Sequence, residues 1–129
     1  MSKIPDDLRY TKDHEYVKKT ADPAIVHVGI TDHAQSELGD VVYVELPKPG
    51  ATLGGGEAFG TIEAVKAVSD LLTPVAGTVT EVNDILASDP ALVNRDPYGD
   101  GWMIKLRVKN PAELNTLLGS AEYTKHVGE

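Results

Sequence analysis

The chain has 129 residues, the size of a single domain, and its 12 lysines and arginines against 20 aspartates and glutamates give a formal net charge of −8. That charge excludes the basic face that nucleic-acid binding requires. The absence of cysteine excludes disulfide bonds, thiolate nucleophiles and metal sites held by cysteine. No apolar run approaches the roughly 18 residues of a membrane span, and the acidic start is unlike a targeting segment. We therefore expect one cytoplasmic domain over residues 1–129, with no nucleic-acid or membrane partner.

Short strands separated by glycine and proline dominate the chain up to residue 108. One helix is expected among them over 31–38, because Thr31 is a favourable N-cap residue and Gly39 a common helix stop. The first two strands are expected to pair as a hairpin. In chain order, the expected strands cover residues 16–17, 24–30, 40–46, 56–64, 67–72, 75–82 and 102–108.

The C-terminal segment, about residues 110–127, changes to a helical pattern. Asn110 before Pro111 is typical of a helix start, and Glu113 completes a capping-box sequence. Ser120 is expected to cap a second short helix over 121–127. Strands first and helices last favour a mainly β fold, namely an antiparallel β-sandwich or flattened barrel with small helical additions.

The sequence contains no self-contained catalytic apparatus. Gly54-Gly55-Gly56 precedes Glu57 rather than the Gly-Lys-Ser/Thr of a phosphate-binding loop. Residues 96–101 resemble part of a calcium loop, but Arg107 stands where the bidentate glutamate is required. The four histidines lack the spacing of a zinc site. We expect no catalytic residue, no metal site and no enzyme activity of the chain by itself.

The segment from Gly60 to Asp70 is the hardest to explain as scaffold alone. Two apolar strand-like runs meet at Lys66, which has small or aliphatic neighbours and no adjacent positive charge. At the apex of a hairpin, its amine would project into water, where an acylating enzyme can reach it. On this pattern alone, however, a lysine in a turn is far more often a solvated charge that protects a sheet edge.

The surrounding residues resemble a known family. Glu63-Ala64-Val65-Lys66-Ala67, followed by Ser69-Asp70, is similar to the lipoyl-attachment motif of glycine cleavage system H proteins. Ala64 departs from the family, in which serine is common at that position, but the lost hydroxyl carries no chemistry. The resemblance implies a lipoyl-domain-like hybrid fold. Similar blocks follow the family's order over nearly the whole chain, at residues 14–15, 29–35, 38–47, 69–77, 97–102 and 122–123.

The resemblance implies that the chain is a lipoyl carrier. Lipoic acid would be joined to Lys66 by an amide, so that the reactive sulfurs belong to the cofactor. The implied partners are the pyridoxal-phosphate glycine decarboxylase (P-protein), which loads an aminomethyl group, and the folate-dependent aminomethyltransferase (T-protein), which removes it. The dihydrolipoyl dehydrogenase (L-protein) would reoxidise the arm, and a lipoate ligase or a lipoyl/octanoyl transferase would attach it.

The resemblance also assigns roles to four acidic or basic side chains. Glu15 is the best candidate to hold the cationic amine of the loaded arm through a charge-assisted hydrogen bond, with His33 and Asp70 lining the same groove. Glu63 is expected to help the lipoylating enzyme recognise the turn. Without the resemblance, Glu15 would be interpreted as a solvated strand-end acid, His33 as a packed helix residue and Asp70 as a turn residue.

Three alternatives remain open at this point. The chain could have the same fold but relay its lipoyl group to other lipoate-dependent enzymes. It could be another swinging-arm carrier, although biotinyl turns place methionine on both sides of the lysine, where this chain has Val65 and Ala67. It could also be an unmodified interaction module in which Lys66 is only a surface charge.

Overall fold

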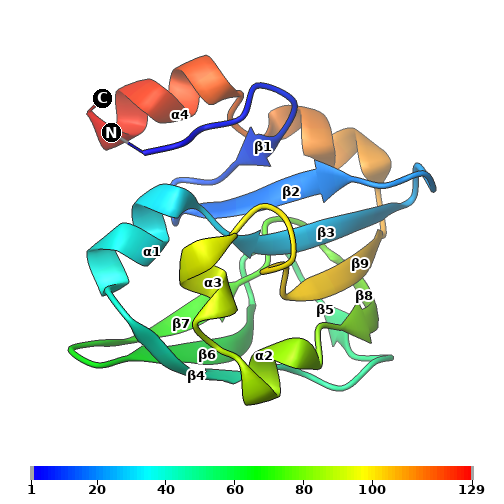
Figure 1. Ribbon diagram of the computed structural model, residues 1–129. Coiled ribbons are helices and arrows are strands. Elements are labelled where there is room, and N and C mark those ends of the chain that lie inside the picture. Colours follow the sequence, from blue (N-terminus) through cyan, green and yellow to red (C-terminus); the bar gives the residue numbers. More distant parts are fainter. Residues whose placement is uncertain (1, 129) are drawn as a thin grey trace.

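The computed structural model describes residues 2–128, and its strands form two antiparallel sheets (Figure 1). The larger sheet has six strands in the order β1-β2-β3-β9-β8-β5, and the smaller has three in the order β4-β6-β7. The sheets do not join into a closed barrel, so the expected mainly β class is confirmed in its sandwich form. The strands are β1 (Arg9–Tyr10), β2 (Glu15–Lys19), β3 (Ile25–Ile30), β4 (Val41–Glu45), β5 (Thr52–Leu53), β6 (Ala58–Ala64), β7 (Val68–Leu72), β8 (Gly77–Val82) and β9 (Ile104–Val108).

The expected helix after β3 is confirmed as α1 (Asp32–Leu38). The Thr31 hydroxyl oxygen accepts a hydrogen bond from the backbone N–H of Ala34 at 3.2 Å, and Gly39 ends the helix. Two single-turn helices between β8 and β9, α2 (Ile85–Ser88) and α3 (Leu92–Arg95), were not expected from the sequence. Each buries one apolar side chain, Leu86 and Val93 respectively, against the sandwich. None of the helices in residues 2–128 has both the length and the apolar character that crossing a membrane requires.

The C-terminal segment differs in detail from the expected helices. Residues 111–116 form a 3₁₀ helix, η1 (Pro111–Thr116), and the chain then extends so that Leu118 exchanges two backbone hydrogen bonds with Tyr10 at 2.8 and 2.9 Å. The next helix, α4 (Ser120–Val127), begins at Ser120 and is capped by Gly119, whose N–H donates to the Glu122 carboxylate at 3.1 Å. The helical conformation does not continue from η1 through Leu118, because Leu114 packs in the main core and Leu118 packs in a separate cluster.

Two apolar clusters hold the fold together. The main core lies between the sheets and is built from the inward side chains of both, together with residues from α2, α3 and η1. The second cluster lies under α4 and joins it to β1 and β2 (Figure 1). In this cluster the rings of Tyr10 and Tyr123 stack with centroids 4.7 Å apart. The N-terminal strands and the C-terminal helix are therefore packed as one unit above α1.

Candidate functional site

Three residues, Val65, Lys66 and Ala67, join β6 to β7 in a hairpin (Figure 1). Ala64 and Ala67 close the loop by exchanging backbone hydrogen bonds at 2.7 and 3.4 Å, which makes a tight hairpin. Val65 and Lys66 are both exposed. The expected hairpin with Lys66 at its apex is confirmed.

The turn after α1 supports this hairpin. The backbone carbonyl of Asp40 accepts a hydrogen bond from the N–H of Val65 at 3.0 Å. Gly39 has φ 81° and ψ −157°, a region that is essentially restricted to glycine. A Cβ atom at Gly39 would stand 3.2 Å from Cε of Lys66, so the lysine side chain lies directly over this glycine. The ammonium group thus rests by the C-terminus of α1, where the helix dipole favours a cation.

Asn94 of α3 fixes the same turn from the other side. Its Nδ2 donates to the carbonyl of Gly39 at 2.9 Å and to Oε1 of Gln35 at 3.0 Å. Its Oδ1 accepts from the backbone N–H of Val41 at 2.9 Å. Val41 is buried, so its N–H needs a protein partner. Sequence analysis did not find this role, because no local pattern connects Asn94 with a turn that is more than 50 residues away.

A cavity of about 180 Å³ lies between α1, the start of β2 and strands β6 and β7. Its walls are largely aliphatic, and carboxylates stand at its base and rim. From Lys66 to Asp70 the extended chain covers about 13 Å, so the lysine lies within reach of the cavity for a long flexible substituent. The cavity is lined by Asp13, His14, Glu15, Ile30, Ala34, Glu37, Leu38, Ile62, Ser69, Asp70 and Leu71.

Glu15 is the buried acid of this cavity, with only 3% of its surface exposed. Its carboxyl oxygens accept hydrogen bonds from the Thr11 hydroxyl at 3.1 Å and from the N–H of Leu72 at 3.5 Å. Burial raises its pKa from 4.5 to about 8, against the opposing effect of these hydrogen bonds. The structure therefore excludes the alternative of a solvated strand-end acid.

The other predicted site residues occupy three different positions. Asp70 is exposed on the rim of the cavity that contains Glu15. His33 does not line that cavity within residues 2–128, but its ring lies 4.8 Å from the ring of His14, which does. Glu63 is exposed on β6, where it pairs with Val68 of β7, and it lies outside the cavity lining. The structure thus brings Glu15 and Asp70 together at the cavity, whereas Glu63 lies outside the cavity lining.

His14 links the cavity to the C-terminal helix. It has φ 70°, which is unusual for a residue other than glycine, and its Nδ1 lies 2.8 Å from the Tyr123 hydroxyl. Burial lowers its pKa, and the neighbouring His33 and His126 add to the effect. Within residues 2–128, no three side chains of His, Asp or Glu are arranged to hold a metal ion.

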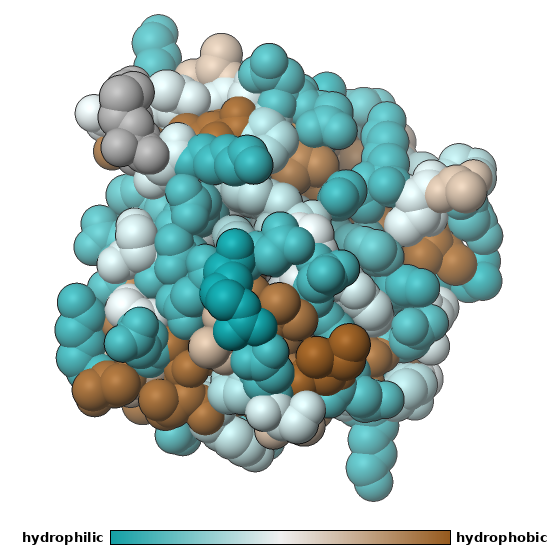
Figure 2. Space-filling model, in the orientation of Figure 1, coloured by the Kyte–Doolittle hydropathy of each residue, from teal (hydrophilic) through white to brown (hydrophobic). Residues whose placement is uncertain are grey.

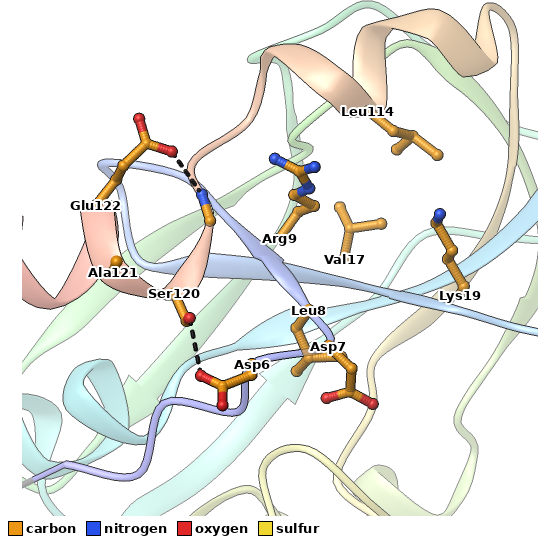
Figure 3. A pocket seen from close by; sticks show the side chains of 11 residues that line it. Asp6, Asp7, Leu8, Arg9, Val17, Lys19, Leu114, Ser120, Ala121 and Glu122 are labelled. Carbon is orange, nitrogen blue, oxygen red and sulfur yellow. Dashed lines mark hydrogen bonds between the residues drawn. The ribbon is translucent and has the colours of Figure 1, made fainter.

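A second cavity, of about 450 Å³, lies between β1, β2 and the start of α4 (Figure 3). Arg9 and Lys19 line it together with three carboxylates, so its charge is mixed. Ser120 Oγ donates to the Asp6 carboxylate at 2.9 Å across it. None of the predicted site residues lines this cavity, whereas Glu15 and Asp70 line the smaller one, which is therefore the candidate site.

These features define a class of protein: a two-sheet β domain that presents one lysine on a tight hairpin beside a cavity with a buried acid. The family model described as "Glycine cleavage H-protein" matches residues 8–129, and the chain belongs to that family. It is 57% identical to a glycine cleavage system H protein of Chlorobium phaeovibrioides, over 97% of this chain and 98% of that protein. It is 52% identical to a mitochondrial one of Oryza sativa subsp. indica, over 99% of this chain and 77% of that protein.

The fold comparison agrees with the family. The crystal structure of a glycine cleavage system H protein from Mycobacterium marinum superimposes with a TM-score of 0.88 at 39% sequence identity. The match covers 98% of this chain and 100% of that one. The expectation of an H-protein family member with a lipoyl-domain-like sandwich is therefore confirmed.

Proposed function

We propose that Lys66 carries a lipoyl group in amide linkage and that the chain is the non-catalytic carrier of glycine cleavage. In this role it takes the aminomethyl group of glycine from the decarboxylase (P-protein) to the folate-dependent aminomethyltransferase (T-protein). It then passes electrons to dihydrolipoyl dehydrogenase (L-protein). A lipoate ligase or a lipoyl/octanoyl transferase acts on it first. The observation that carries the proposal is the exposed Lys66 at a hairpin apex within reach of a cavity with a buried acid.

The residues at the site fit a lipoyl group. Lys66 offers an accessible amine, and Ile30, Leu38, Ile62 and Leu71 offer aliphatic walls to an alkyl chain. When bound, the group supplies the dithiolane sulfur chemistry that a chain without cysteine lacks. The chain supplies the attachment point and a cavity in which the carboxyl group of Glu15 is buried.

Glu15 is proposed to lose its proton when a cationic group enters the cavity. Burial keeps its carboxyl largely protonated near neutral pH. A cationic amine in the cavity favours the ionised form and the charge-assisted hydrogen bond that goes with it. Asp70 on the rim and His33 behind His14 are proposed to assist. Recognition of the hairpin is proposed for Glu63, and the cytoplasmic location expected from the sequence stays a prediction.

Intact mass tests the attachment. We expect the chain expressed with lipoate to gain the mass of one lipoyl group, and Lys66→Arg to gain none. Lys109→Arg, at an exposed lysine just after β9, is the matched control and should gain the group as the parent chain does. An unmodified chain in its native source would overturn the proposal.

Reconstitution separates the carrier role from the relay role. We expect the lipoylated chain to support exchange of carbon dioxide with the carboxyl group of glycine when it is mixed with glycine decarboxylase. A lipoylated chain that supports no exchange, yet transfers its lipoyl group to another lipoate-dependent enzyme, would assign the relay function instead.

A further inference from the structure

The outer face of the small sheet is exposed beside Lys66. We use "outer face" for the exposed side chains of Val42, Tyr43, Glu45, Glu63, Val68 and Asp70. Tyr43, Glu63 and Val68 lie opposite one another across β4, β6 and β7, nearest the hairpin, and Glu45 and Asp70 flank Thr61 in a further row. In Figure 2, hydrophobic side chains gather at the lower left, over the hairpin end of this sheet.

A β-bulge produces the apolar part of this face. Val41 pairs with Ala64 and Tyr43 with Glu63, so Val42 is an extra residue in β4. Regular alternation after the buried Val41 would turn Tyr43 inward, but the bulge turns it outward and leaves both Val42 and Tyr43 about half exposed. Val68, at 69% exposure, stands on the other side of Glu63 from Tyr43, so apolar side chains flank a carboxylate in the row nearest the hairpin. Such patches mark interaction surfaces.

The charge of the outer face has one sign. Strands β4, β6 and β7 contain Glu45, Glu63 and Asp70 but no lysine, arginine or histidine. None of these three carboxylates forms an ion pair with another residue in the range 2–128. A complementary surface therefore offers apolar contacts to Tyr43 and Val68 and a basic group to Glu63, which lies between them.

We propose that the outer face is the docking surface for the enzyme that acylates Lys66, an enzyme whose contact region combines apolar side chains with lysine or arginine. This inference rests on the proposed function. In the acylation step, Nζ forms a bond to the carbonyl carbon of an activated acyl group, the leaving group departs with its electron pair, and Nζ gives up a proton. Nζ must come within about 3 Å of that carbon.

The geometry of the acylation step indicates that the acylating enzyme is the partner that docks on the outer face. An enzyme that acts on the far end of a long arm can stay away from the hairpin. The acylating enzyme meets a bare lysine and must contact the residues around it. Val65, with 76% of its surface exposed, and Val68 lie within two residues of Lys66. The carboxylates of the outer face also speed its encounter with a basic partner, an effect that salt reduces.

The test measures acylation of the unmodified full-length chain by lipoate ligase with lipoate and ATP, followed by intact mass. Tyr43→Thr combined with Val68→Thr keeps residues that favour strands while it removes apolar contact area. We expect kcat/KM for acylation to fall roughly tenfold, through KM rather than kcat. Ile85→Thr is the matched control, since Ile85 is an exposed apolar residue on α2, outside the outer face. Its kcat/KM should equal that of the parent chain.

A charge variant gives a second readout. Glu63→Gln should lower kcat/KM and weaken its dependence on ionic strength, whereas a purely structural role would leave the salt dependence unchanged. Circular dichroism and thermal unfolding establish that each variant is folded.

Three results would overturn the inference. The double variant could be acylated as fast as the parent chain, or it could lose kcat at constant KM. It could also be acylated normally but lose turnover with glycine decarboxylase, which would assign the face to that enzyme. Failure of the parent chain to accept any lipoyl group is a different result, since it would overturn the proposed function itself.

Discussion

Replacing Glu15 with glutamine tests whether burial controls the charge of the cavity. Glutamine has nearly the shape of the protonated acid, its amide oxygen still accepts from the Thr11 hydroxyl, and it stays neutral at every pH. In the parent chain, the unfolded carboxyl releases its proton near pH 4.5 and the folded one near pH 8. Between these values the unfolded state binds fewer protons, so the free energy of unfolding falls as pH rises.

The size of this fall follows from the pKa difference. Each pH unit between the two pKa values changes the free energy of unfolding by about 1.4 kcal/mol. Between about pH 5 and pH 8, integration gives a loss of about 3 to 4 kcal/mol from this one group. The whole stability of a domain this size is roughly 5–15 kcal/mol, so the effect is large enough to measure.

The assay is urea unfolding of the parent chain and Glu15→Gln across this pH range. We expect the variant to gain stability relative to the parent as pH rises, with the full difference reached near pH 8. Glu63→Gln, at an exposed carboxyl, controls for the loss of one negative charge. A difference between Glu15→Gln and the parent that stays constant from pH 5 to pH 8 would refute the reasoning.

Three further substitutions test the supports of the site. Gly39→Ala forces a side chain into a glycine-only conformation and should lower the free energy of unfolding in urea by about 1 to 3 kcal/mol. Gly56→Ala is the control for a glycine at positive φ away from the site, because no atom lies near the added Cβ. Asn94→Ala leaves the buried N–H of Val41 without its partner and should cost about 2 kcal/mol, whereas an unchanged denaturation midpoint would remove Asn94 from the support. Burial lowers the pKa of His14, so the stability that its neutral side chain contributes is lost as pH falls below 6.5. Asparagine tolerates positive φ and does not titrate, so the melting temperature of His14→Asn should depend less on pH in that range.

The parts of the site that depend on local sequence were predictable. The cap at Thr31 and the stop at Gly39 define α1 through contacts only a few residues long. The hairpin around Lys66 follows equally from two apolar runs that meet at a polar residue. In both cases the determining hydrogen bonds join residues close in the chain.

The parts that depend on long-range packing were not predictable. Glu15 lies at the start of a strand, and only the cover provided by α1 and β7 turns it into a buried acid with a raised pKa. The bulge at Val42 leaves no mark in the sequence, because Val-Val-Tyr-Val suits a regular strand equally well. The helical pattern expected after Asn110 ends at Thr116, because Leu114 and Leu118 pack in different clusters.

The alternation of side chains along β6 and β7 divides the proposed tasks of the hairpin between two surfaces. Ile62 and Ser69 pair across the strands and face the cavity, while the next pair, Glu63 and Val68, faces solvent. Lys66 stands where these surfaces meet. The two surfaces share only Asp70, which belongs to the outer face and stands on the cavity rim, so an enzyme docked on the outer face leaves the rest of the cavity lining free. The two proposals make separate demands on the sequence: substitutions at Glu63 and Val68 should alter acylation, whereas substitutions at Glu15 should alter only what happens after it.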